Sequence, residues 1–177
     1  MLKTIGISHP AFSGSKRDET VAFYRDLLGM AIVLLQGNLD VPEEDHYFFH
    51  AGGDNFIAYF LPKEGVETRL PPARPGSGWM DHLAIDVLPN SIDRWAERLR
   101  AAGVEFDGPI DRGYERSVYF KDPNGVTIEL LSWLTPLPQG YAQAEVIRAA
   151  QALRTRRGAE FIEDQDIQGA IHSLPQE

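Results

Sequence analysis

The side chains of this sequence that could hold a metal ion are histidines and carboxylates, because the chain has five histidines and no cysteine. Thiolate zinc sites, iron–sulfur clusters, disulfides and cysteine nucleophiles are therefore excluded. His9 and His82 occupy matching places, each in a strand-like segment just before a predicted helix, and Glu129 lies in a later strand-like segment. Two imidazoles and one carboxylate can occupy one face of an octahedral ion and leave positions open for substrate. This pattern favours a catalytic metal site with His9, His82 and Glu129 as ligands.

Each of the three residues also has an ordinary structural explanation. His9 could be a solvated residue at the end of a strand, and His82 a core histidine bonded to Asp81 or to the backbone. Glu129 is a charged residue in an otherwise apolar strand, where an unpaired buried carboxylate is costly. A metal ion or Arg116 would supply the missing positive charge. The joint placement of the three residues is a stronger argument than any one of them.

Two successive parts of the chain show the same order of predicted elements. The first predicts a strand at 4–9, a helix from the capping-box pattern Ser15–Asp18 to Gly29, and strands at 31–35, 46–50 and 56–60. The second predicts a strand at 79–87, a helix from Asn90 or Ser91 to Gly103, and strands near 104–106, 117–121 and 126–133. The repeat is one of element order, since direct identity between the two parts is low.

A stretch rich in proline and glycine separates the two parts and defines the expected domain boundaries. We predict a first module at 1–63, a linker at 64–78, a second module at 79–135 and a helical extension at 136–177. The extension contains a helix with Val146, Ala150 and Leu153 on one stripe and a second, shorter helix. Their apolar stripes must be covered by the sheet, by each other or by a second subunit.

Composition narrows the classes of partner. A formal net charge of -9 at pH 7 gives no electrostatic footprint for nucleic acid. No apolar stretch approaches the roughly 18 residues that a membrane span needs. We therefore expect a cytoplasmic protein that acts on a small-molecule substrate and binds neither nucleic acid nor membrane.

Several motifs resemble those of the vicinal oxygen chelate superfamily, which includes glyoxalases, fosfomycin-resistance thiol transferases, bleomycin-binding proteins and extradiol dioxygenases. The resemblance covers about residues 1–135 and is carried by His9, the stretch Ala22–Gly29, Asp81–Ile85 and Tyr119–Leu130. It implies an α+β fold in which two βαβββ modules form an open curved β-cup, followed here by the C-terminal helices. It also implies one divalent metal on His9, His82 and Glu129. Glyoxalase I has a fourth protein ligand where this sequence has only the strand 56–60, which places a glutathione-dependent lyase in doubt.

The resemblance also bears on the reaction. Extradiol dioxygenases have a tyrosine ten residues before the glutamate ligand, as Tyr119 is to Glu129, but the acid/base histidine that they use shortly before that tyrosine is absent here. His46 or His50 could replace it. Tyr119 could equally be a packing residue, because a two-residue turn would set Val118 opposite Glu129, whereas one bulged residue would set Tyr119 there.

Two further residues are candidates for substrate binding. Tyr114 and Arg116 could contact an anionic or phenolic substrate, or could be edge residues of the sheet. The best hypothesis is extradiol ring cleavage of a catechol by a homodimer with Fe(II), with Mn(II), Ni(II) and Zn(II) left open. The alternatives are a glyoxalase-like lyase, isomerase or thiol transferase on the same three ligands, and a metal-free protein that binds an aromatic antibiotic.

Overall fold

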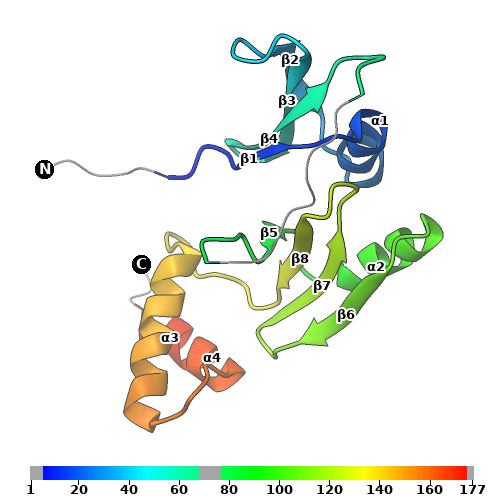
Figure 1. Cartoon of the computed structure of the whole chain (residues 1–177). Coiled ribbons are helices and arrows are strands. Elements are labelled where there is room, and N and C mark those ends of the chain that lie inside the picture. Colours follow the sequence, from blue (N-terminus) through cyan, green and yellow to red (C-terminus); the bar gives the residue numbers. More distant parts are fainter. Residues whose placement is uncertain (1–5, 68–76, 175–177) are drawn as a thin grey trace, which may run out of the picture. The chain divides into compact units, whose positions relative to one another are not determined.

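The computed structural model describes residues 6–67 and 77–174 and contains two four-stranded sheets, each with its own helix (Figure 1). The chain divides into two compact units. The first unit comprises Met1–Leu83 and Lys121–Ile128, and the second comprises Ala84–Phe120 and Glu129–Glu177. Most of the predicted linker, residues 68–76, lies outside the described residues.

The first sheet has the strand order β1-β4-β3-β2. Its elements are β1 (Ala11–Ser13), α1 (Arg17–Val21), a π-helical turn η1 (Ala22–Leu27), β2 (Ile32–Gly37), β3 (Glu44–Gly52) and β4 (Asn55–Pro62). Strand β1 pairs in parallel with β4, and the other pairs are antiparallel. Residues 4 and 5 of the strand predicted at 4–9 lie outside the described residues, and β1 begins at Ala11, directly after Pro10, which has no N–H for a ladder.

Alternation along β3 and β4 divides the first sheet into two chemically different faces. Tyr47, Phe49 and Tyr59 are almost fully buried, and Tyr24 of the π-helical turn packs on Phe49 and Tyr59. The side chains between them along β3 and β4 point to the opposite face, since successive strand residues alternate. These residues, which we call the histidine face, are His46, Phe48, His50, Phe56 and Phe60.

The start of α1 differs from the predicted capping box. The helix begins at Arg17, with Lys16 at the N-cap position and no side-chain capping bond. The side-chain oxygen of Asn124, in the turn after β7 (Glu115–Lys121), accepts instead from the backbone N–H groups of Ser15 and Lys16, at 3.1 and 3.4 Å. A tertiary contact therefore fixes the two residues that lead into this helix.

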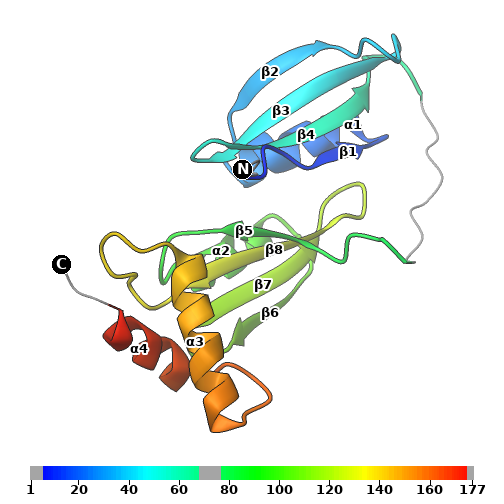
Figure 2. The ribbon, with the colours of Figure 1, turned by 90° about the vertical axis from the view of Figure 1, so that its left-hand side faces the viewer.

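The second sheet repeats the topology of the first, with the order β5-β8-β7-β6. Its elements are β5 (Leu83–Asp86), α2 (Ile92–Ala101), β6 (Phe106–Asp111), β7 and β8 (Thr127–Trp133). The predicted pair of βαβββ modules is thus confirmed. Helix α2 lies on one side of this sheet and α3 (Gln143–Arg157) on the other (Figures 1 and 2).

The C-terminal helices α3 and α4 (Asp164–Ser173) share a small core of their own. Val146 and Ala150 of α3 are buried with Ile167 and Ala170 of α4. Tyr114 of the β6–β7 turn and Trp133 of β8, together with other partly buried residues, pack against this core, so the helices cover each other and one end of the second sheet. Of the helices in the described residues, none is long and apolar enough to cross a bilayer.

Candidate functional site

The two candidate histidine ligands belong to the first unit and both make local contacts through the Nδ1 atom. Nδ1 of His82 is 2.8 Å from Oδ2 of Asp81, and Nδ1 of His9 is 3.0 Å from the Ser8 hydroxyl. A carboxylate that accepts from Nδ1–H leaves the lone pair of the neutral ring on Nε2 and orients the ring. The Asp81–His82 pair therefore has the chemistry of a metal ligand with its supporting carboxylate.

His46 and His9 lie near the same aromatic side chain of the histidine face. The rings of both contact Phe48, with centroids 4.8 Å away in each case, and His46 also stacks on Phe60 at 4.2 Å. Burial lowers the pKa of His46, and the charge of His9 lowers it further. The Nε2 atom of His46 is buried without a hydrogen-bond partner. A neutral imidazole of this kind can accept a proton.

His50, the other histidine considered for proton transfer, is at the exposed end of β3. Its Nε2 lies 2.8 Å from the carbonyl oxygen of Gly53 in the β3–β4 turn. That contact gives His50 a local structural role, in contrast to His46.

Glu129 is a buried carboxylate of the second unit, with 4% of its surface exposed. The Tyr119 hydroxyl donates to its Oε1 at 2.5 Å. The pairing of β7 with β8 explains this contact. In the turn between these strands, the Asp122 N–H donates to the carbonyl of Val126 at 2.9 Å across three intervening residues. Counting back along both strands sets Tyr119 opposite Glu129, so the bulged alternative is the one that the chain adopts.

A third side chain, which the sequence did not indicate, extends this contact. Arg112, in the β6–β7 turn, hydrogen-bonds Tyr119; that bond raises the pKa of Arg112, as does the charge of Glu129, while burial opposes them. The same carboxylate helps to raise the pKa of Glu115, after the larger effect of burial. We call Arg112, Tyr119 and Glu129 the carboxylate chain. Nothing in the pattern of an exposed turn distinguishes Arg112 from other surface arginines.

Arg116 and Tyr114 are placed differently from each other. Arg116 donates to both carboxylate oxygens of Asp93 on α2, at 2.8 and 2.9 Å, so it lies on the helix side of the sheet, away from Tyr119 and Glu129. This placement favours the edge explanation for Arg116. The Tyr114 ring lies 5.4 Å from that of Trp133 and lines a pocket beside α3.

The candidate ligands are divided between the two units, with His9 and His82 in the first and Glu129 in the second. Among residues 6–67 and 77–174, no group of three or more His, Asp or Glu side chains forms a metal site. The donor set itself suits a divalent ion of intermediate softness: two imidazoles, one with a supporting carboxylate, and one buried carboxylate held by a tyrosine.

Comparison with known proteins identifies the family. The model of the Glyoxalase/Bleomycin resistance protein/Dioxygenase superfamily matches residues 6–130. The chain belongs to this superfamily. A solved structure described as a putative dioxygenase from Bacillus subtilis is 26% identical, with a TM-score of 0.61 over 79% of this chain and 44% of that one. The vicinal oxygen chelate fold that the sequence motifs implied is therefore confirmed.

Curated relatives within the superfamily carry different activities. Biphenyl-2,3-diol 1,2-dioxygenase 2 of Rhodococcus globerulus is 40% identical over 68 residues, which are 37% of this chain and 35% of that protein. Metallothiol transferase FosB of Staphylococcus haemolyticus (strain JCSC1435) is 28% identical over 127 residues, which are 71% of this chain and 81% of that protein. The chain thus spans about a third of the dioxygenase but most of the transferase.

Proposed function

We propose that this chain is a metal-dependent enzyme that cleaves the ring of a catecholic substrate with molecular oxygen. One divalent ion, with Fe(II) favoured, would be held by His9, His82 and Glu129. The observation that carries the proposal is the hydrogen bond from Tyr119 to Glu129, which joins the two residues that the extradiol resemblance pairs. The 40% identity to a biphenyl-diol dioxygenase over a segment of 68 residues supports the same reaction class.

Neighbouring side chains would hold two of the proposed metal ligands in position. Asp81 fixes the ring of His82, and Tyr119 fixes the carboxylate of Glu129 through a short, charge-assisted hydrogen bond. A bound ion would act as a Lewis acid toward two adjacent substrate oxygens and favour their deprotonation. The positive charge of Arg112, one hydrogen bond beyond Tyr119, favours anionic groups at this end of the second sheet.

His46 is our candidate for the residue that accepts the substrate proton. It shares Phe48 with His9, its Nε2 is without a partner among the described residues, and burial favours its neutral form. Proton transfer to a positioned side chain contributes typically 10²–10⁴-fold to a rate. His46→Gln should therefore lower kcat by about that factor while metal content stays unchanged.

The deciding experiment is anaerobic loading with Fe(II), followed by oxygen uptake with a panel of catechols. Loading with Mn(II) and the variant His82→Gln are the comparisons, and His172→Gln is the matched control, because His172 is an exposed histidine of α4 bonded to a backbone carbonyl. Uptake by the unaltered protein and by His172→Gln, and its loss in His82→Gln, is expected. Equal metal binding by all three proteins would contradict the role of His82.

We further propose that the three metal ligands come either from one chain or from two chains of a homodimer. Mixing two inactive variants distinguishes these arrangements. If the site is shared across subunits, co-refolded His82→Gln and Glu129→Gln chains regain part of the activity, because one site in each mixed dimer has all three ligands. If the site lies within one chain, the mixture stays inactive.

The coverage of the metallothiol transferase favours a second candidate reaction, thiol transfer on the same three ligands. Consumption of thiol by the Mn(II)-loaded protein with fosfomycin, and no oxygen uptake with any catechol, would select it. A third alternative is metal-free binding of an aromatic antibiotic. It would be selected by a protein that binds no transition metal and gains no thermal stability when Fe(II), Mn(II) or Ni(II) is added.

A further inference from the structure

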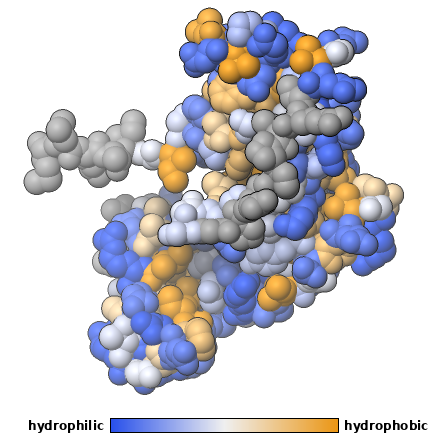
Figure 3. Space-filling model, viewed as in Figure 1, coloured by the Kyte–Doolittle hydropathy of each residue, from blue (hydrophilic) through white to orange (hydrophobic). Residues whose placement is uncertain are grey.

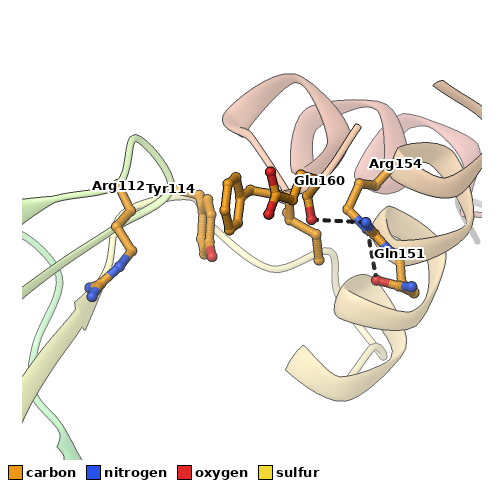
Figure 4. A pocket seen from close by; sticks show the side chains of 7 residues that line it. Arg112, Tyr114, Gln151, Arg154 and Glu160 are labelled. Atoms are coloured by element: carbon orange, nitrogen blue, oxygen red, sulfur yellow. Dashed lines mark hydrogen bonds between the residues drawn. The ribbon is translucent and has the colours of Figure 1, made fainter. Parts of the chain in front are cut away.

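A pocket of about 610 Å³ lies within the second unit, between the β6–β7 turn and the C-terminal helices. Figure 4 shows Arg112 and Tyr114 on the side of the turn and Gln151 and Arg154 on α3, with Glu160 from the segment after α3. Its volume is in the range of small-molecule sites, which are commonly about 300–1,000 Å³. The helices outside the repeated modules therefore form one wall of a cavity large enough for a ligand.

The lining of the pocket combines aromatic and apolar side chains with positive charge. Tyr114 and Phe161 supply rings, and Phe161 is 70% exposed although it is large and apolar. Figure 3 shows apolar surface among hydrophilic residues over the C-terminal helices. Two guanidinium groups, of Arg112 and Arg154, line the pocket against the single carboxylate of Glu160. An excess of positive charge beside aromatic rings suits an aromatic anion.

The two arginines have different tasks. Arg154 donates to the carbonyl oxygens of Ala159 and Glu160 at 2.6 and 2.9 Å and to Gln151 at 3.1 Å, so it holds the segment after α3 in place. Arg112 is 3.8 Å from the nearest oxygen of Glu115, longer than a hydrogen bond, and 40% of its side chain is exposed. Besides its hydrogen bond to Tyr119, the guanidinium group of Arg112 therefore has exposed surface left for the carboxylate of a ligand.

Arg112 also connects the pocket to Glu129. Within the second unit it both lines the pocket and hydrogen-bonds Tyr119, whose hydroxyl donates to Glu129. Trp133 lies four residues after Glu129 on the same face of β8, and its ring contacts that of Tyr114, which also lines the pocket. A ligand on Arg112 would therefore lie one side chain from Tyr119.

We propose that this pocket binds an aromatic carboxylate, with the ring against Tyr114 and Phe161 and the carboxylate on Arg112. Arg112 of the β6–β7 turn would then select the anion, and Phe161 of the segment after α3 would contribute to binding its ring. The identification of this ligand as the substrate rests on the proposed function. Binding of the ligand in the pocket does not depend on that function.

The test measures binding without metal, by calorimetry in the presence of a chelator. The probes are 2-naphthoate and 2-naphthalenemethanol, which share the ring system and differ in charge. We expect naphthoate to bind at least about tenfold more tightly, since a hydrogen bond to a charged group outweighs a neutral one. Equal affinities, or no binding by either probe, would overturn the proposal.

Substitutions in the pocket test which side chains contact the ligand. Arg112→Gln should remove the preference for naphthoate and leave the affinity for the alcohol unchanged, and Phe161→Ala should weaken both probes several-fold. Arg112→Lys should keep part of the preference, because it keeps the charge but not the planar fork. Arg148→Gln, on an exposed position of α3 outside the pocket, is the matched control and should bind like the unaltered protein. A naphthoate preference that survives in Arg112→Gln would refute the assignment.

The outcomes also separate this proposal from the proposed function. Naphthoate binding without oxygen uptake on any catechol would leave the pocket intact and reject ring cleavage. Ring cleavage of catechols without any preference for carboxylate-bearing ligands would reject the pocket alone.

Discussion

Asp122 and Glu129 are buried carboxylates only seven residues apart in the same hairpin, yet their surroundings differ. Asp122 accepts four hydrogen bonds: from the hydroxyls of Tyr24, at 3.1 Å, and Tyr59, and from the backbone N–H groups of Asn124 and Val126, both at 2.9 Å. Each Asp122 oxygen thus has two donors from the first unit.

Glu129 is held by Tyr119 from its own sheet, followed by the positive charge of Arg112. Four donors from the surrounding scaffold compensate the burial of Asp122, which therefore stabilises the first unit. The hydroxyl of Tyr119 orients the carboxylate of Glu129, an arrangement that suits a metal ligand. Burial of a carboxylate therefore does not by itself indicate function, whereas the residues that surround it distinguish Asp122 from Glu129.

The largest expected effect is the loss of activity in Glu129→Gln. Removal of a charged ligand takes away several kcal/mol of transition-state stabilisation, so oxygen uptake by the Fe(II)-loaded protein should fall by at least about 10³-fold. Glu105→Gln, an exposed carboxylate of the same unit, is the control and should retain full activity. Wild-type turnover in Glu129→Gln would remove Glu129 from the site.

The next effect concerns stability and falls on the other carboxylate. Asp122→Ala leaves two buried tyrosine hydroxyls and two backbone N–H groups without their acceptor, which should lower the free energy of unfolding by about 3–5 kcal/mol. Urea denaturation measures the change, and Tyr59→Phe, which removes one donor only, should cost about 1–2 kcal/mol. A difference below about 1 kcal/mol for Asp122→Ala would show that this carboxylate does not stabilise the first unit.

Tyr119→Phe tests whether the partner of Glu129 serves the metal. The loss of a group that orients a ligand typically weakens metal affinity or activity by about 10–100-fold, so Fe(II) or Mn(II) titration should detect a shift of that size. Tyr141→Phe, in the segment before α3, is the matched control. Unchanged affinity and turnover in Tyr119→Phe would favour the packing explanation.

The tyrosines around Asp122 predict how stability responds to alkaline pH. Burial raises the pKa of Tyr24 and of Tyr59, and the Asp122 charge adds to both shifts. In the unfolded chain each hydroxyl loses its proton near pH 10, whereas the folded protein keeps it. The unfolded state therefore binds fewer protons above that pH, and the free energy of unfolding should fall there by up to about 1.4 kcal/mol per pH unit and tyrosine.

Thermal unfolding between pH 9 and 11 measures this slope. The double variant Tyr24→Phe/Tyr59→Phe should show a shallower fall than the unaltered protein, whatever its own starting stability. Equal slopes would show that these hydroxyls titrate normally in the folded state.

The smallest effect is expected at Arg116, whose partner Asp93 has a largely exposed side chain. Exposed ion pairs contribute little, so Arg116→Gln should change Tm by less than about 3 °C and leave metal affinity unchanged. A marked loss of metal binding in this variant would contradict the placement of Arg116 on the helix side of the sheet.

The repeated order of elements and the available types of metal ligand can be predicted from the sequence. Alternating apolar residues in the strands and the helical spacing of Ile92 and Leu99 produce the βαβββ pattern twice, and the absence of cysteine restricts metal binding to imidazole and carboxylate. These features depend on local periodicity and composition, so they can be read without coordinates.

The identity of the side chains around Glu129, by contrast, depends on long-range contacts. The turn after β7 has three residues between Asp122 and Val126, and a shift of one residue in this register would have moved Tyr119 to the other face. The same parity sends Arg116 toward α2, while Arg112 reaches Tyr119 from the β6–β7 turn. The sequence near Asp122 is compatible with either turn length. The register is fixed by hydrogen bonds to the Asp122 side chain, some of them from residues far away in the chain.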